Sequence, residues 1–584
     1  MDSLRDALKA ALQSTGETLP GLRQRLDERV EPRRERPVVP KTTTMPTLSD
    51  AEFNQLRKLG GRVVPAQDNG LRERIHKPRF EPQPVNSSAI SAFSSPSKPM
   101  PAPIPTCTLE FSPHPRCRLN ALEGKRYDLL ANVEKAGGAE QCQTTTINDE
   151  REVAFGLDFG TSSVKVVIGD MAVKAFAVPF CQADGLGAYL LPTRLYQTND
   201  AFSLVSGEVI YRDLKLSFVA QPDNRLNQIR IVAFLALVIA RARGWLFTKH
   251  LATYKNTKIV WKLSVGLPAA SSLETELASQ LRRLVYVAWR FAATPQALTE
   301  EIIGTALDAF VGSNDPTSSV EVAVVPEIAA QIYGFVVSNS FDKRAVNNYL
   351  MVDVGAGTVD SSLFHVKPAK GGKWDFEFFT AVVEPHGVTN LHRHRVNWWA
   401  QSLERCNAPK ELAEKMLISK FDADHQVPLP ESFTEYFDGV QANFKNGAIS
   451  PDRDFFDNRV AYQVRSKTIG QTRRNNSLDA NALSGIPMFL CGGGARMQYY
   501  LALKGELLRK PGCSWLWADA SRTMRVPGDL VADGLDDADY DRISVAYGLS
   551  RLEVGKVIKA LPLPKVAIEP VDSWRDNYVD KDQC

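Results

Sequence analysis

Cysteine is scarce in this chain. Its 584 residues include eight cysteines, and no two of them form a CxxC pair. A disulfide framework is typical of short secreted domains and is not expected in a chain of this length and composition. We therefore predict reduced, mostly buried thiols and a cytoplasmic location.

Long hydrophobic runs and an excess of charge are also lacking. The longest apolar run, IVAFLALVIA at residues 231–240, falls well short of the ~20 residues that span a bilayer, so it predicts a buried helix and no membrane span. The first twenty residues carry acids and lack the basic start and apolar core of a secretory signal. A net charge of +3 gives no reason to expect a nucleic-acid partner.

Proline is concentrated at one end of the chain. Of 35 prolines, 16 lie in residues 1–150, and proline disfavours both helix and central strand. Residues 1–100 also carry 17 Lys and Arg against 12 Asp and Glu. We predict that residues 1–150 are a largely disordered, basic extension, either a solvated tail or a contact for a protein partner.

Strand-like and helix-like patterns alternate from residue 153 onward, which favours an α/β fold. Strands are predicted at residues 153–157, 164–168, 258–266, 320–325, 349–354 and 488–491. Helices are predicted at residues 227–242, 271–293, 327–339 and 396–405.

Two predicted hairpins have the same unusual turn. In GLDFGTSSVK an apolar strand reaches Asp158 and then turns through Gly160, Thr161 and Ser162. In VDVGAGTVDSS a second strand reaches Asp353, turns through residues 355–358 and continues to another acid. Glycine lets backbone N–H groups approach an anion, and the carboxylates can hold the waters of Mg²⁺, so the pair predicts a polyphosphate site.

A third turn follows the strand at residues 488–491. There Gly492, Gly493 and Gly494 precede Arg496 and a predicted helix. A glycine-rich strand-to-helix turn favours close approach of a nucleotide, and a planar guanidinium can stack on an adenine ring.

The three turns together resemble motifs of the actin-like ATPase superfamily, most of all the nucleotide-binding domain of heat-shock protein 70 (DnaK-type) chaperones. Residues 158–163 are similar to its first phosphate motif, residues 353–360 to its second, and residues 492–496 to its adenosine motif. Residues 325–335 and 544–555 resemble its two connecting segments.

This resemblance covers residues 153 to 559 and implies a two-lobed fold. Each lobe would have a ribonuclease-H-like core, with ATP and Mg²⁺ in the cleft between the lobes. The implied boundaries are lobe I at 151–345, lobe II at 346–560 and a C-terminal tail at 561–584.

The resemblance also implies roles for single residues. Asp158 and Asp353 would hold Mg²⁺ through water, and the catalytic group would be Glu327, Asp353, Asp360 and Lys215. Lys215 is placed by position alone, and an ordinary surface lysine is the alternative. Nucleotide contacts are implied for Asp158, Gly160, Thr161, Ser162, Gly355, Gly357, Thr358, Gly387, Gly492, Gly493 and Arg496.

Some parts of the family pattern differ or are missing. Ala356 replaces a glycine of the second phosphate motif, and Gly387 is all that remains of a GGED motif. The ribose-binding helix is not recognisable, and Lys445 is the nearest candidate from it. The 36 residues after Gly548 are too few for the family's peptide-binding β-sandwich, so peptide clamping is not expected.

The function implied by the resemblance is an ATP-binding, slowly hydrolysing, chaperone-type switch. Three alternatives share the motifs: an actin-like filament-forming or segregation protein, a sugar-type small-molecule kinase, and a nucleotide-binding pseudo-ATPase scaffold. A zinc site at His386, His392 and His394 is disfavoured, because positions 392 and 394 diverge on a helix. Trp398 and Trp399 are predicted to pack within a lobe.

Overall fold

The computed structural model describes most of the chain from residue 149 to residue 559, and short parts before it. The described residues are 106–119, 127–131, 133, 147, 149–272, 275–294, 296–310, 320–420, 429–445, 447–507, 517–521 and 524–559. Residues 1–105 of the predicted extension and the predicted tail at 561–584 lie outside them.

A seven-stranded sheet organises the first half of the molecule, in the order β10-β9-β2-β3-β4-β17 with β5 paired to β3. β2 is antiparallel to β3, and β3 to β4, whereas β9 and β10 run parallel to β2. The bounds are β2 (Asp149–Phe159), β3 (Ser163–Asp170), β4 (Ala175–Ala177), β5 (Leu191–Pro192), β9 (Thr257–Leu267), β10 (Val320–Pro326) and β17 (Leu530–Val531).

A six-stranded sheet organises the second half, in the order β16-β15-β11-β12-β13-β18. The bounds are β11 (Asn348–Val354), β12 (Val359–Pro368), β13 (Trp374–Glu384), β15 (Ser484–Cys491), β16 (Trp517–Ser521) and β18 (Val554–Lys559). Its central strand β11 is again antiparallel to the next strand and parallel to β15. The two sheets therefore repeat one strand order and one set of directions.

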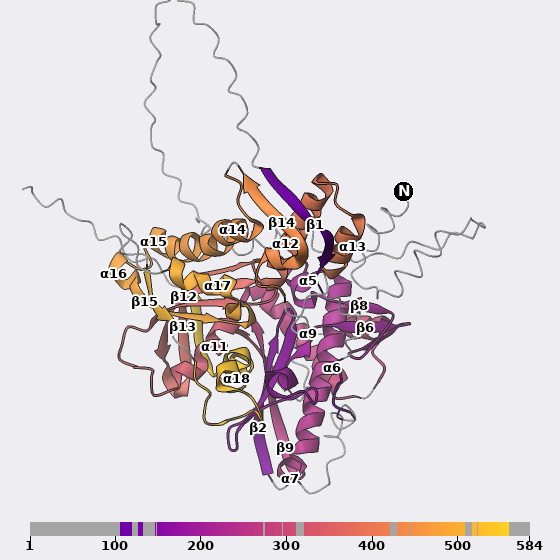
Figure 1. Cartoon of the computed structure of the whole chain (residues 1–584). Coiled ribbons are helices and arrows are strands. Elements are labelled where there is room, and N and C mark those ends of the chain that lie inside the picture. The colour runs from indigo at the N-terminus through magenta and orange to yellow at the C-terminus, as the bar shows by residue number, and fades with distance from the viewer. Residues whose placement is uncertain are drawn as a thin grey trace, which may run out of the picture.

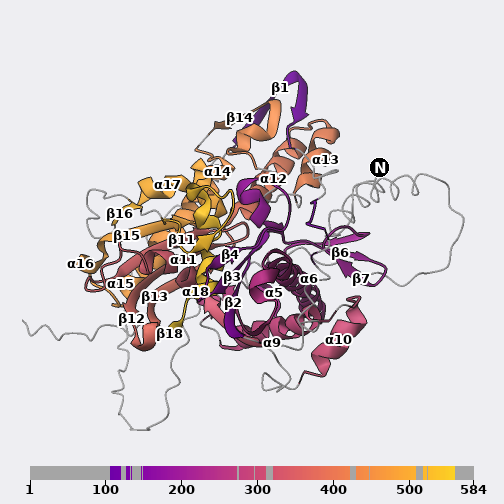
Figure 2. The ribbon, with the colours of Figure 1, turned by 90° about the horizontal axis from the view of Figure 1, so that it is seen from below.

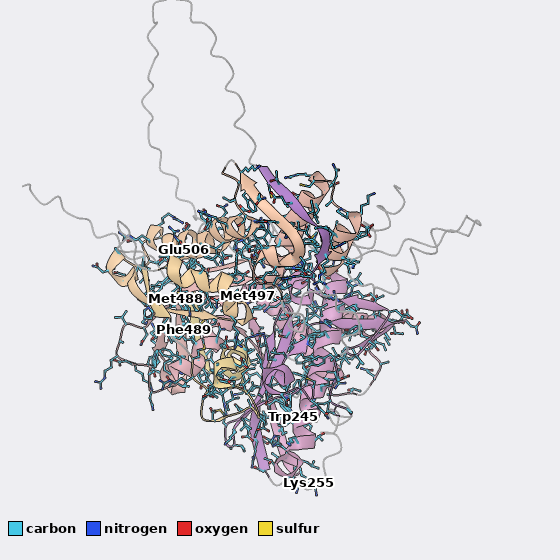
Figure 3. The ribbon with its side chains drawn as sticks, viewed as in Figure 1. Trp245, Lys255, Met488, Phe489, Met497 and Glu506 are labelled. Carbon is cyan, nitrogen blue, oxygen red and sulfur yellow. The ribbon has the colours of Figure 1, made fainter. Side chains whose placement is uncertain are left out.

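Helices cover these sheets, and the two halves are distinct in the ribbon (Figure 1). Those of the first half are α5 (Leu214–Ala220), α6 (Arg225–Lys249), α7 (Leu251–Tyr254), α8 (Ala269–Ser272), α9 (Thr275–Ala292) and α10 (Glu300–Asp308). Those of the second are α12 (Val388–Arg405), α13 (Lys410–Ser419), α14 (Pro451–Phe455), α15 (Gly470–Arg474), α16 (Ala480–Leu483) and α17 (Gln498–Glu506). Met488 and Phe489 of β15 lie within the second half, and Trp245 of α6 lies in the first (Figure 3).

α6 contains the apolar run that the sequence predicts to be a buried helix. Within the described residues it is the one helix long and apolar enough to cross a membrane, but 78% of its most apolar stretch is buried. Its residues Ile231, Phe234 and Ile239 pack in the core against β2 and β9. This burial is what a core helix of an α/β protein shows.

Two further helices join the halves, α11 (Glu327–Val336) and α18 (Ser544–Arg551). They lie side by side between the two sheets (Figures 1 and 2). Gly548 of α18 lies so close to α11 that an added Cβ would be 1.9 Å from the carbonyl oxygen of Ala330. On its other side α18 lies on β2, where a Cβ at Gly156 would be 2.1 Å from the carbonyl oxygen of Ala546.

The α/β prediction is confirmed, and the predicted strands all lie within β2, β3, β9, β10, β11 and β15. The described residues of the helix predicted at 271–293 belong to α8 and α9, and the helix predicted from residue 396 begins at Val388. α12 begins earlier because Gly387 and the turn at residues 355–357 provide hydrogen-bond partners for its first residues.

Two features cross the predicted domain boundaries. Within the extension predicted to be largely disordered, β1 (Thr106–Cys117) pairs antiparallel with β14 (Phe437–Lys445), and the two project from the second half. β17 and α18 fall inside the segment assigned to lobe II, yet β17 pairs with β4 and α18 packs on β2.

A second small sheet lies beside α6. It has the order β7-β6-β8, and its bounds are β6 (Leu195–Thr198), β7 (Ala201–Ser203) and β8 (Val209–Tyr211). Its last strand, β8, is followed directly in the chain by α5.

Candidate functional site

The three predicted turns meet at one cavity of 340 Å³, a volume in the range of small-molecule sites. Asp158 and Asp353 are each the penultimate residue of their strand, so both carboxylates stand at the carboxyl ends of the central strands. That end of a sheet is where α/β proteins bind ligands. The predicted site residues that line the cavity are Asp158, Gly160, Thr161, Ser162, Lys215, Glu327, Asp353, Gly355, Thr358, Asp360, Gly492, Gly493 and Arg496.

The first turn is held by Thr193, whose hydroxyl donates a hydrogen bond of 2.7 Å to the carbonyl oxygen of Gly160. The carboxylate of Asp158 accepts a bond of 2.9 Å from the Lys165 ammonium, which comes from the neighbouring strand β3. Both side chains are largely buried, at 9% and 12% exposed. This lysine places a positive charge where the first turn faces the cavity.

A second buried ion pair joins α5 to α11. The ammonium of Lys215 donates a short hydrogen bond to Glu327, the first residue of α11. Gly266 leaves the space for this carboxylate, since a Cβ there would lie 2.7 Å from Glu327 Cγ. Lys215 is therefore a buried cavity residue and not an ordinary surface lysine.

Burial disfavours the ionised form of two acids that line the cavity, Asp353 and Asp360. Burial raises the pKa of Asp353 to about 7, and the nearby charges of Glu327 and Asp158 add to this effect. Burial likewise raises the pKa of Asp360 to about 7, although its carboxylate accepts hydrogen bonds from the Ala269 N–H (2.8 Å) and the Ser362 hydroxyl (3.0 Å). Raised pKa values of this kind are typical of carboxyl groups that transfer protons.

The second turn is supported from beneath by the start of α12. The Gly387 N–H donates to the carbonyl oxygen of Gly357 (3.2 Å), and the Asn390 side-chain amide donates to the same oxygen (2.6 Å). The Thr389 hydroxyl donates to the carbonyl oxygen of Ala356 (2.7 Å).

Two predicted nucleotide contacts, Gly357 and Gly387, are not among the residues that line the cavity. A Cβ at Gly387 would lie 2.5 Å from the carbonyl oxygen of Ala356, so this glycine permits the turn to pack on α12. A Cβ at Gly357 would lie 2.7 Å from Leu216 Cδ1 of α5, so this glycine permits close contact between the halves.

The same contact between halves contains an ion pair. The Arg393 guanidinium of α12 donates a hydrogen bond of 2.6 Å to the carboxylate of Asp213, which directly precedes α5. The two side chains are 13% and 22% exposed. The pair ties the segment that carries Lys215 to the helix that supports the second turn.

The third turn carries its arginine in a fixed position. Arg496 forms ion pairs with Asp539 and Asp541 and donates a 3.0 Å bond to the carbonyl oxygen of Ala538. Met497, the next residue, lines the cavity and lies toward the middle of the molecule (Figure 3). The carboxylates hold the guanidinium plane at the cavity edge, where a flat ring can lie against it.

Four charged cavity residues were not predicted from the sequence: Lys165, Glu431, Asp541 and Arg542. Lys165 is visible in the sequence as the cation that follows the first turn on the next strand. Glu431 accepts a 3.0 Å hydrogen bond from the Gln498 N–H at the start of α17, so it lies beside the third turn. The candidate Lys445 is instead at the exposed end of β14, paired with β1, and does not line the cavity.

The histidines and tryptophans near α12 are packing residues. His392 is hydrogen-bonded to the Tyr436 hydroxyl (2.7 Å) and the carbonyl oxygen of Ser419 (3.0 Å), and burial lowers its pKa to about 4. Trp399 is buried, and its indole N–H donates to the carbonyl oxygen of Phe433 (2.9 Å). Trp398 packs against the Phe433 ring.

No protein-family model matches the chain, and no curated protein matches it in sequence.

Proposed function

We propose that this protein is an ATP-binding, slowly ATP-hydrolysing switch of the DnaK-like type, with an actin-like two-lobed fold and a ribonuclease-H-like core in each lobe. The observation that carries the proposal is the convergence of three glycine-rich turns, from two sheets of one strand order, on one cavity. Two sheets of the same topology, each of which contributes a turn to the cavity, are suited to binding a ligand between two lobes.

The cavity lining suits a nucleoside triphosphate. Turns at residues 161–162 and 356–358 offer backbone N–H groups and the hydroxyls of Thr161 and Thr358 for phosphate oxygens, while the N–H groups of Gly160 and Gly355 close the turns. Arg496 and Glu431 lie at the third turn, where a guanidinium face suits a base and a carboxylate suits sugar hydroxyls. Lys165 and Lys215 supply positive charge to the phosphate end.

Asp158 and Asp353 fit a Mg²⁺ ion held through water. In the described part of the chain no three His, Cys, Asp or Glu side chains lie close enough to hold a metal directly, and Mg²⁺ usually keeps several waters. When bound, Mg²⁺ would neutralise phosphate charge as the terminal phosphoryl group leaves.

The remaining roles, proton transfer and the positioning of carboxylates, belong to side chains and backbone groups of the chain. Asp353 lines the cavity at the end of β11, where its carboxylate can accept the proton of an attacking water. Lys215 holds the Glu327 carboxylate in place, and the Ala269 N–H holds that of Asp360. Binding would draw the halves together about α11 and α18, and a protein partner or client, contacted through residues 1–150, would receive the change.

Binding and turnover by the full chain test the proposal. We expect Mg²⁺–ATP to bind once per chain, and phosphate release to fall by at least about tenfold in Asp353→Asn. Asp158→Asn should weaken Mg²⁺–ATP binding, and Glu208→Gln, at an exposed acid outside the cavity, should change neither quantity.

The outcomes separate the alternatives. Binding without turnover would indicate a pseudo-ATPase scaffold, and filaments in electron micrographs with ATP would indicate the filament-forming alternative. A wild-type chain that binds no nucleotide would refute the proposal.

A further inference from the structure

Arg542 lines the cavity, and the residues that the structure describes give its guanidinium no hydrogen-bond or ion-pair partner. It ends the 3₁₀ helix at Asp537–Arg542 that precedes α18, and its guanidinium lies against the third turn. A Cβ added at Gly493 would be 2.8 Å from Arg542 Cζ and 3.0 Å from both terminal nitrogens. The guanidinium thus occupies the space over Gly493 and forms part of the cavity wall.

The neighbouring charged groups are already engaged with other residues. Asp541, the residue before Arg542, binds Arg496, and Asp158 binds Lys165. Among the residues that the structure describes, none forms a hydrogen bond or an ion pair with the Arg542 guanidinium. Burial lowers the pKa of Arg542, whereas the negative charge of Asp541 raises it. The charge of Arg496 acts in the direction of burial, and those of Asp158 and Asp353 act in the direction of Asp541.

The Arg542 side chain is partly exposed, and its N–H donors meet the cavity without an acceptor from the described residues. An arginine remains charged at any pH at which the protein is folded, so this side chain offers a permanent positive charge to a ligand. A phosphate group in the cavity can accept two parallel bonds from the guanidinium fork.

We propose that Arg542 is a phosphate-binding residue of the nucleotide site, which holds the phosphate nearest the nucleoside from the side of the third turn. Its position supports this assignment. The guanidinium lies over Gly493 of the third turn, in the same cavity that Asp158 and Asp353 line. The inference rests on the proposed function and adds a third cation to Lys165 and Lys215.

This role links nucleotide binding to the helices that join the two halves. Arg542 stands two residues before α18, and α18 packs on α11 through Gly548. A phosphate bound by Arg542 therefore acts on the start of the helix that packs on the first sheet and on α11.

Calorimetric titration with ADP and with adenosine, both with Mg²⁺, tests the inference on the full chain. One charge-assisted interaction corresponds to about a ten- to hundredfold change in affinity, so Arg542→Ala should bind ADP that much more weakly. Adenosine affinity should stay within about twofold of wild type, because adenosine has no phosphate. Arg542→Lys should fall between the two for ADP, since it keeps the charge and loses the fork.

The matched control is Arg525→Ala, at an exposed arginine upstream in the same segment that does not line the cavity, and it should bind both ligands as wild type does. ADP binding by Arg542→Ala at wild-type strength would overturn the inference and leave the proposed function intact. Equal losses for ADP and adenosine would assign Arg542 to packing and also overturn it. A wild-type chain that binds neither ligand would refute the proposed function itself.

Discussion

Replacement of Gly548 by alanine tests the contact between α11 and α18 that joins the halves. The added Cβ would lie 1.9 Å from the carbonyl oxygen of Ala330, 2.5 Å from its carbonyl carbon and 2.8 Å from its Cα. Atoms in favourable contact lie ~3.5 Å apart, so the helices would have to separate by roughly 1.5 Å. The backbone of α11 cannot rotate away as a flexible side chain can.

The size of the effect follows from two opposed contributions. Overpacking of this kind destabilises by about 1–3 kcal/mol, and so large a displacement belongs at the upper end. Alanine in a helix is favoured over glycine by about 1 kcal/mol. We therefore expect Gly548→Ala to lower the free energy of unfolding by ~2 kcal/mol.

Gly505→Ala is the matched control, because Gly505 lies in α17 and no atom lies within 4 Å of the position of an added Cβ. Its free energy of unfolding should be unchanged or raised by up to ~1 kcal/mol. Urea unfolding followed by circular dichroism measures both variants. If Gly548→Ala unfolds at the same urea concentration as Gly505→Ala, the close packing of α11 on α18 is wrong.

Three further predictions concern charge at the site. Asp353 and Asp360 have folded-state pKa values of about 7, above the ordinary 3.8, so the folded protein retains protons that the unfolded chain releases. The free energy of unfolding without ligand should therefore fall as pH rises from about 4 toward 7. This pH dependence of the urea midpoint should disappear in the Asp353→Asn/Asp360→Asn double variant. The Asp213–Arg393 pair should couple by about 0.5–3 kcal/mol in a double-mutant cycle of the free energy of unfolding, whereas additive single effects would show that the pair is not formed. Chelation of Mg²⁺ by EDTA should weaken ATP binding in calorimetry and leave adenosine binding unchanged, and equal effects on both ligands would contradict a metal at the phosphate end.

The local motifs were readable from the sequence because each lies on one strand and one turn. Asp158 and Asp353 end apolar runs that had to be buried strands, and the glycines that follow mark the turns. In the folded chain the three turns, which belong to two sheets, line one cavity. The sequence therefore predicts Asp158 and Asp353 as site residues, but not the side chains that surround them.

Other site features depend on tertiary packing that no local pattern encodes. Arg542 reaches the cavity from the segment before α18, far along the chain from the first turn. Gly357 and Gly387 show as glycines in the sequence, but only the packing of α5 and α12 reveals which atoms they make room for. The pairing of β1 with β14 joins strands more than 300 residues apart, and such register is set by the folded surroundings.

Hydrogen exchange of the full chain, with and without Mg²⁺–ATP, tests the central claim most directly. If the three turns grip one nucleotide, ATP should slow exchange together at residues 158–165, 353–360 and 492–496, which belong to two different sheets. Slower exchange in one of these segments alone, or in none of them, would contradict the account.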